Sequence, residues 1–238
     1  MDILPEIIAN VQNPIIVTDP PFNIGYKYRS YADNLTDKDY YAMLKNVCSF
    51  CPSVVIHYPE ALYRLAIEMG QVPTKVVSWV YNSNTPRQHR DIAFFACKPD
   101  FSKVRQPYKN PKDKRIQERI ANGCLGGKLY DWWNINQVKN VSKDKTAHPC
   151  QMPIEVMQNI VKILPDDVTI IDPFMGSGTT GAACAIAGKS FVGIESDNEY
   201  YNIAKVRIHS FLTLNGLKSR NCQRLHFHFR DDCHGCRQ

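Results

Sequence analysis

The chain has 238 residues, of which 44% are apolar and 22% charged, a composition that fits one globular domain and argues against disorder or a fibrous protein. No run approaches the roughly 18 apolar residues of a membrane span, and the acidic N-terminus lacks a secretory signal, so we expect no membrane association. The formal net charge of +6 suggests a polyanionic partner, and nine scattered cysteines without a disulfide framework favour a reduced, cytoplasmic setting.

The first third of the chain alternates between strand and helix patterns. Residues 14–18 form an apolar run that predicts a buried strand ending at Asp19. Thr36 is a helix cap that precedes apolar residues at helical spacing up to Phe50. The same criteria predict further strands at 53–58, 75–81 and 91–97 and a helix at 60–69.

The regular pattern breaks at about Lys98, and residues 98–147 contain no long periodic element. The basic excess lies here, because residues 82–147 hold 14 Lys and Arg against 6 Asp and Glu, while the rest of the chain holds 15 against 17. Such a segment is typical of a surface that binds a polyanionic partner. The candidate residues for binding that partner are Arg87, His89, Arg90, Lys109, Lys112, Lys114 and Arg115. The aromatic run Tyr130 to Trp133 predicts a small core inside this segment, and contact with the bound partner is the alternative.

Regularity returns with a helix at 153–164, a strand at 168–172, a helix at 179–187, a strand at 190–194 and a helix from Asp197 to about Leu212. Continuous apolar strands that alternate with helices predict an α/β fold with a doubly wound, mostly parallel sheet, like a Rossmann fold.

A glycine motif follows the strand at 168–172. Gly176, Gly178 and Gly181 have G-x-G-x-x-G spacing between a strand and a helix, which is the setting that a nucleoside cofactor requires. Glu195 closes the next strand, where a carboxylate can bind ribose hydroxyls. The motif alone is also compatible with a nicotinamide cofactor.

A second motif, Asp19-Pro20-Pro21-Phe22, follows the first apolar strand. The prolines fix the turn, so that its carbonyl groups and the Asp19 carboxylate point in set directions. Hydrogen-bond acceptors beside an aromatic ring suit a planar base that carries an amino group.

These two motifs together resemble the amino-group DNA methyltransferases, which methylate N6 of adenine or N4 of cytosine using S-adenosylmethionine. The catalytic motif precedes the glycine motif, with a basic segment between them, and this order resembles the β class of that family. The resemblance implies a catalytic-motif half at 1–81, a target-recognition segment at 82–147, a cofactor-binding half at 148–212 and a basic tail at 213–238.

The segment from His148 to Pro153 is similar to the family's His-Pro-Thr-Gln-Lys-Pro, although Cys150 and Met152 depart from it. Family members usually have an edge strand before the acidic residue that corresponds to Asp2, and we expect that strand to be missing. The resemblance implies catalytic roles for Asp19, Pro20, Pro21 and Phe22. It implies cofactor contacts from Asp2, Ile3, Asp19, His148, Pro149, Gln151, Phe174, Gly176, Ser177, Gly178, Thr179, Thr180 and Glu195.

The expected reaction is direct methyl transfer to a flipped base in double-stranded DNA. Asp19 and the Pro20 carbonyl would accept the amino N–H groups while Phe22 stacks on the ring. An Asp at the first motif position is commoner among the family's adenine enzymes, so N6 of adenine is the expected target. The alternatives are an N4-cytosine enzyme, an RNA methyltransferase, a nicotinamide-dependent oxidoreductase and a non-catalytic DNA-binding module. A cysteine nucleophile at Cys150 is disfavoured by its place before the glycine motif.

The tail contains Cys222, Cys233 and Cys236 with several histidines, but the irregular spacing favours a poorly ordered basic tail over zinc, so we expect no metal. A prokaryotic or phage origin follows from the resemblance, and a homodimer and a cognate restriction endonuclease remain open as partners.

Overall fold

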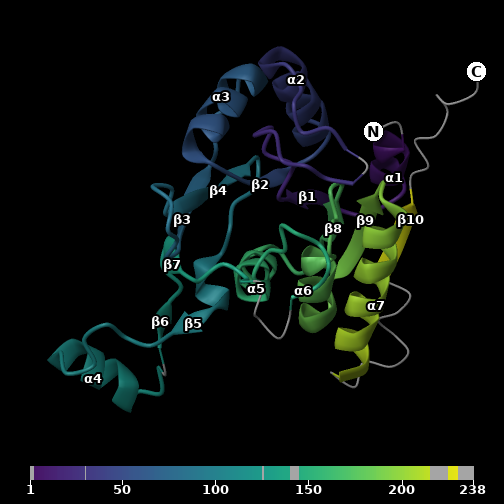
Figure 1. The fold of residues 1–238 in the computed structure, drawn as a ribbon. Coiled ribbons are helices and arrows are strands. Elements are labelled where there is room, and N and C mark those ends of the chain that lie inside the picture. The colour runs from purple at the N-terminus through teal and green to yellow at the C-terminus, as the bar shows by residue number, and fades with distance from the viewer. Residues whose placement is uncertain (1–2, 30, 125, 140–144, 215–224, 230–238) are drawn as a thin grey trace, which may run out of the picture.

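The computed structural model describes residues 3–29, 31–124, 126–139, 145–214 and 225–229. Within these ranges one large sheet has the strand order β10-β9-β8-β1-β2-β4-β3-β7 (Figure 1). Neighbouring strands are parallel except at β4, which runs antiparallel to β2 and β3. The predicted doubly wound, mostly parallel sheet is confirmed. The strands are β1 (Pro14–Thr18), β2 (Ser53–His57), β3 (Lys75–Val80), β4 (His89–Phe95), β7 (Trp132–Asn134), β8 (Thr169–Asp172), β9 (Ser190–Glu195) and β10 (Leu225–Phe229).

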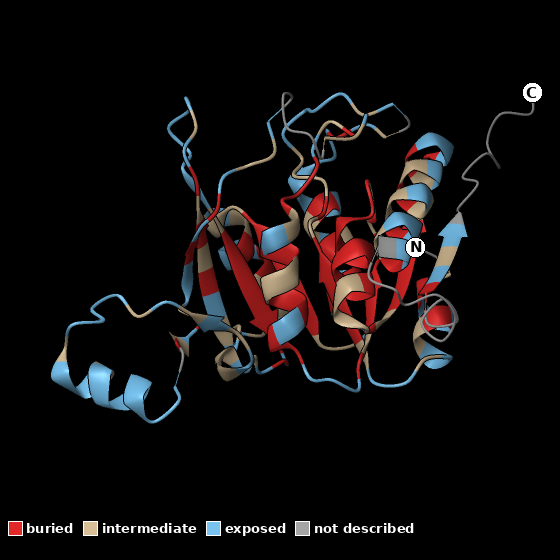
Figure 2. Cartoon of the chain, turned by 90° about the horizontal axis from the view of Figure 1, so that it is seen from below, coloured by how far each residue is buried: buried red, intermediate tan, exposed pale blue. Residues whose placement is uncertain are grey.

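Helices cover both faces of this sheet, and the buried strands lie between the two helical layers (Figure 2). Helices α1 (Leu4–Ala9), α2 (Asp37–Cys48) and α3 (Pro59–Met69) pack on one face; α5 (Ile154–Ile163), α6 (Thr179–Ala187) and α7 (Asn198–Leu214) pack on the other. Strand β1 shows why its sequence is continuously apolar. Ile16 packs into the first layer, whereas Ile15 and Val17 pack into the second, because alternate side chains point to opposite faces.

The basic segment is only partly separate from the sheet. Strands β4 and β7 both belong to the large sheet, so the sheet continues past the expected boundary at residue 82. The remainder forms η1 (Phe101–Lys103), the ribbon β5 (Arg105–Gln106) with β6 (Gly127–Lys128), and α4 (Lys114–Ala121), a helix that the sequence analysis did not predict. Helix α4 projects from the main body and buries none of its residues (Figures 1 and 2).

The expected aromatic core of this segment is divided between two environments. Trp133 is buried in the main core, and its neighbour Trp132 is 44% exposed. Both residues lie on β7, where alternation along the strand places them on opposite faces.

The sheet edge beside β9 is occupied by β10, which pairs with β9 in parallel register. The strand that the sequence analysis expected to be missing is one before Asp2, and at this edge a strand from the C-terminal tail pairs with β9 instead. The expectation of a poorly ordered tail is therefore wrong for residues 225–229. The cysteines Cys222, Cys233 and Cys236 lie outside the described residues. Among the helices of the described residues, none is long and apolar enough to cross a membrane.

Candidate active site

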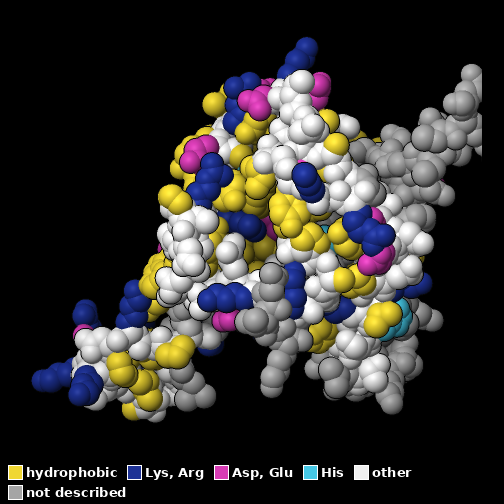
Figure 3. Space-filling view, in the orientation of Figure 1, with side chains coloured by type: hydrophobic (Ala, Val, Ile, Leu, Met, Phe, Trp, Pro, Cys, Tyr) yellow, Lys and Arg dark blue, Asp and Glu magenta, His cyan; other side chains and the backbone are white. Residues whose placement is uncertain are grey.

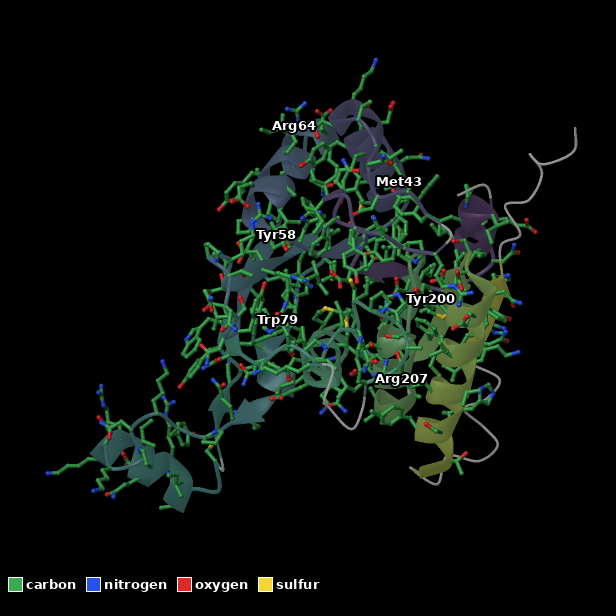
Figure 4. All side chains as sticks on the ribbon, in the orientation of Figure 1. Met43, Tyr58, Arg64, Trp79, Tyr200 and Arg207 are labelled. Carbon is green, nitrogen blue, oxygen red and sulfur yellow. The ribbon has the colours of Figure 1, made fainter. Side chains whose placement is uncertain are left out.

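A cavity of about 300 Å³ opens at the carboxyl ends of β1, β8 and β9. The helix after β8 packs on one face of the sheet and the helix after β1 on the other, so the cavity lies where the winding reverses. Open α/β sheets bind their ligands at such a point. Tyr58, which follows β2, and Tyr200 on α7 lie on opposite sides of the cavity (Figure 4). The two sequence motifs, far apart in the chain, therefore contribute to one site.

The segment Asp19 to Phe22 lines this cavity, as expected. The Asp19 side chain is 15% exposed, and burial raises its pKa to about 6 against the opposing charge of Arg90. Among the described residues, its buried Oδ1 atom has no hydrogen-bond partner. A buried acceptor of this kind is available to a ligand that enters the cavity.

A hydrogen-bond chain braces the motif from behind. The Tyr58 backbone N–H donates to His57 Nδ1 (2.7 Å), so the ring proton is on Nε2 and is donated to the Tyr40 hydroxyl (2.7 Å). The Tyr40 hydroxyl in turn donates to the Pro21 carbonyl (2.7 Å). Burial, together with Arg90 and Arg87, lowers the pKa of His57 to about 3, which keeps the ring neutral. The sequence analysis missed Tyr40 and His57, which carry no motif.

Glu195 holds the glycine segment directly. Its Oε2 atom accepts the Gly176 backbone N–H (2.8 Å), and Oε1 accepts the N–H groups of Ser196 (2.9 Å) and Asp197 (2.8 Å). Burial nevertheless raises the pKa of the carboxyl group. The carboxylate therefore fixes the loop that lines the cavity as well as facing the cavity itself.

Asp172 connects the two motifs. Its carboxylate accepts the hydroxyl of Thr180 (2.6 Å), the hydroxyl of Thr18 (3.1 Å) and the Phe174 N–H (3.1 Å). Thr18 immediately precedes Asp19, so Asp172 connects β1 to the start of α6. Burial raises the pKa of Asp172 to about 7 despite these donors.

The predicted cofactor residues divide into two groups. Those that line the cavity are Ile3, Asp19, His148, Phe174, Gly176, Ser177, Thr179, Thr180 and Glu195. Gly178, Pro149 and Gln151 are not in the lining; Gln151 accepts the Thr146 N–H (2.8 Å) and so shapes the loop. Asp2 lies outside the described residues. Cys150 and Met152, the two departures from the family pattern, both line the cavity.

His148 packs against the glycine segment and α7. Its ring meets that of Tyr200 edge-on, with centroids 4.5 Å apart. A Cβ on Gly176, whose φ is +51°, would lie 3.0 Å from His148 Nε2, so close approach and backbone angle both favour glycine there. His148 Nδ1 is buried and has no partner in the part of the chain that the structure describes. Burial lowers the pKa of the His148 ring to about 4.

The loop after Phe22 forms a wall of the cavity that the sequence did not reveal. Tyr26, Tyr28 and Tyr31 line it, and the Asp33 carboxylate accepts three backbone N–H groups of the same loop. Arg29 forms an ion pair with Glu199 on α7. The loop therefore spans from the catalytic motif to the cofactor side. Its only sequence signal was the density of tyrosines.

The DNA-binding candidates occupy two places. Lys112, Lys114 and Arg115 are exposed on or beside α4, where basic side chains cluster (Figure 3). Lys109 lies over the rings of Tyr130 and Trp132, His89 is exposed, and Arg87 packs over Tyr58, 4.1 Å from the ring centroid. Arg90 differs from the rest, because its side chain is 16% exposed and lies in the cavity wall beside Asp19.

Solved structures of DNA methyltransferases share this fold. The PvuII DNA methyltransferase (cytosine-N4-specific) aligns over 94% of this chain and 91% of its own, with a TM-score of 0.60 and 16% identity. The M1.HpyAVI–SAM complex aligns over 87% and 94%, with a TM-score of 0.52 and 24% identity.

Sequence comparisons point to the same group of proteins. The Type II methyltransferase M.HpaI of Haemophilus parainfluenzae is 27% identical over 82% of this chain and 68% of its own length. M.ScaI of Streptomyces caespitosus is also 27% identical, over 82% and 74%. The family model described as DNA methylase (N6_N4_Mtase) matches residues 73–206, which is more than half of the chain. With its two motifs in one cavity, the chain belongs to this family of amino-group DNA methylases.

Proposed function

We propose that the protein transfers a methyl group from S-adenosylmethionine to N6 of adenine in double-stranded DNA at a specific site. One observation carries the proposal: the buried, unpartnered Oδ1 of Asp19 lines the same cavity as the glycine segment and Glu195. A hydrogen-bond acceptor for the amino group and a cofactor cradle are thus parts of one site. The similar Type II methyltransferases support a role in restriction-modification.

The residues that line the cavity suit S-adenosylmethionine chemically. Ile3, Phe174 and Ile194 supply apolar walls for an adenine ring, and Glu195 supplies a carboxylate for ribose hydroxyls. The unpartnered His148 Nδ1 is a further polar atom next to this region. The cofactor, when bound, supplies an electrophilic methyl group on a sulfonium.

Asp19 and the neighbouring turn perform the protein's part of the reaction. In the proposed step the amino nitrogen would form a bond to the methyl carbon as the carbon–sulfur bond breaks and leaves a neutral thioether. The nitrogen would then pass one proton to Asp19 Oδ1, from which it leaves to solvent. Asp19 Oδ1 would accept an N–H of the amino group, which aims its lone pair and stabilises the positive charge that develops on nitrogen. Phe22 would stack on the flipped base.

The exposed basic side chains of the α4 region would bind the DNA backbone. Three of them, Lys112, Lys114 and Arg115, are exposed on or next to α4, which buries none of its residues. Exposed cations on a projecting helix can reach the phosphates of a DNA duplex. We assign the target-recognition role to residues 98–131, because β4 and β7 on either side belong to the sheet.

The alternative nucleophile, Cys150, is not activated. Burial raises the pKa of its thiol, whereas a catalytic cysteine needs a lowered one. We therefore propose direct transfer with no covalent enzyme intermediate.

The test is methylation of DNA by the purified protein with S-adenosylmethionine, followed by mass spectrometry of the nucleosides. We expect N6-methyladenine; N4-methylcytosine would replace the proposed target, and no methylated nucleoside on DNA of broad sequence content would refute the activity. Asp19→Ala should abolish transfer while cofactor affinity, measured by calorimetry, stays within several-fold. Asp37→Ala, at an exposed residue of α2, is the matched control and should remain active.

A further inference from the structure

Arg90 lies beside the catalytic carboxylate, surrounded by aromatic rings. Its Nη1 is 3.7 Å from Asp19 Oδ2, which is an ion pair without a hydrogen bond. The guanidinium carbon lies 4.5 Å from the ring centroid of Phe22 and 5.4 Å from that of Trp79. Both side chains of the pair are less than one-fifth exposed. An arginine held in this way is not placed like a surface phosphate ligand.

The two oxygens of Asp19 have different surroundings. Oδ2 faces the guanidinium, whereas Oδ1 is buried and has no partner among the described residues. Arg90 thus occupies one side of the carboxylate and leaves the other free for an amino group.

Building on the proposed function, we propose that Arg90 is a positioning residue for methyl transfer, which keeps Asp19 ionised and turned so that Oδ1 faces the target amino group. An ionised carboxylate accepts N–H groups from both oxygens, whereas a protonated one can present an O–H to the amino nitrogen instead. Burial raises the pKa of Asp19 to about 6, and the charge of Arg90 opposes that rise. Without the arginine, more of the enzyme would carry a protonated Asp19 at neutral pH.

Other titratable groups face Asp19, and none of them supplies a positive charge. Electrostatic interactions connect it with Asp172 on β8, Tyr28 and Cys150 on the cavity loops, Tyr40 on α2 and Tyr81 after β3. Each of these carboxyl, phenol and thiol groups is neutral when protonated and negative when deprotonated. Arg90 is therefore the cation that sets the ionisation of Asp19 among the described residues.

Position 152 is close enough to Arg90 for a side chain there to carry the positive charge in its place. Arg90 Nη1 lies 3.7 Å from the Met152 sulfur, and the methionine side chain is buried in the cavity wall. A lysine at position 152 has a similar length and would bring its ammonium group close to the place that the guanidinium leaves. The double variant Arg90→Met with Met152→Lys therefore moves the charge without adding one.

The experiment measures the single-turnover methylation rate against pH, with DNA and cofactor both saturating. In the parent enzyme we expect the acid limb near pH 6, where Asp19 titrates. Arg90→Met should move this limb up by about 1–3 pH units, so that the rate is lost at neutral pH and largely recovered at higher pH. Arg90→Lys and the double variant both keep a positive charge near Asp19, so their acid limbs should lie close to that of the parent enzyme. Arg64→Met, an exposed arginine on α3, is the control and should leave the profile unchanged.

Three results would overturn the assignment. The first is an acid limb of Arg90→Met that coincides with that of the parent enzyme. The second is a raised KM for DNA at every pH, which would make Arg90 a DNA ligand. The third is a double variant as impaired as Arg90→Met. If Arg90→Met does not fold, Arg90→Gln provides the neutral side chain for the same comparison. Failure of the parent enzyme to methylate DNA would instead refute the proposed function.

Discussion

Tyr40→Phe tests whether the hydrogen-bond chain behind the catalytic motif holds the motif in place. The substitution removes only the hydroxyl that joins His57 Nε2 to the Pro21 carbonyl, with 2.7 Å on each side. It leaves a donor and an acceptor without partners, each at a cost of about 1–3 kcal/mol. We expect the free energy of unfolding, measured by urea denaturation, to fall by about 2–4 kcal/mol. The single-turnover rate should also fall, by about tenfold, because the Pro20–Pro21 turn loses its support.

Tyr41→Phe is the matched control for this experiment. Tyr41 is the next residue on α2 and is half-buried, and its ring contacts Tyr40 and Arg64, contacts that phenylalanine retains. We expect its stability to change by less than about 0.5 kcal/mol. If Tyr40→Phe were as stable and as active as Tyr41→Phe, the chain would not support the motif and the reasoning would be refuted.

Two further substitutions test the last glycine of the motif and the Glu195 carboxylate. Gly181→Ala should destabilise the fold by about 1–2 kcal/mol in thermal unfolding, because the new Cβ would lie 2.4 Å from Ile208 Cδ1 and overpacking outweighs the helix propensity gained. Adding Ile208→Val to Gly181→Ala removes the clashing Cδ1 atom and should recover part of that loss. If Gly181→Ala were more stable than the parent protein, the predicted clash would be refuted. Glu195→Gln should weaken cofactor binding about tenfold or more in calorimetry, because the amide cannot accept all three backbone N–H groups. An unchanged affinity would contradict a role for the carboxylate in shaping the site.

The sheet could be predicted from sequence because its strands are strongly apolar on both faces. β1, β2, β8 and β9 all begin within one residue of their predicted starts, and the helices between them carry ordinary caps such as Thr36. The elements that were missed have weaker signals. α4 is short and buries nothing, and its one apolar pair at helical spacing, Ile116 and Ile120, lies within a strongly charged stretch. β10 alternates histidine with apolar residues in a segment where the cysteines drew attention to metal binding.

The site was predictable only where a motif is contiguous. The sequence predicted two segments of the site, Asp19 to Phe22 and Gly176 to Thr180. In each of them, neighbouring residues form a single turn that faces the cavity, so the motif is visible in the sequence. Arg90 and His57 belong to strands β4 and β2, and their proximity to the catalytic motif depends on strand order. Sequence spacing carries no information about such contacts, so Arg90 was assigned with the surface basic residues.

The central strand β1 is flanked by partners made at very different times during synthesis. Ile16 pairs with Ser53 on β2 and with Ile171 on β8. At about 5–20 residues per second, the ribosome completes the second partner about eight to thirty seconds after β1. During that interval one edge of an apolar strand has unpaired backbone groups, the usual template for association with other chains. Production at lower temperature or with a holdase chaperone should therefore raise the yield of folded protein.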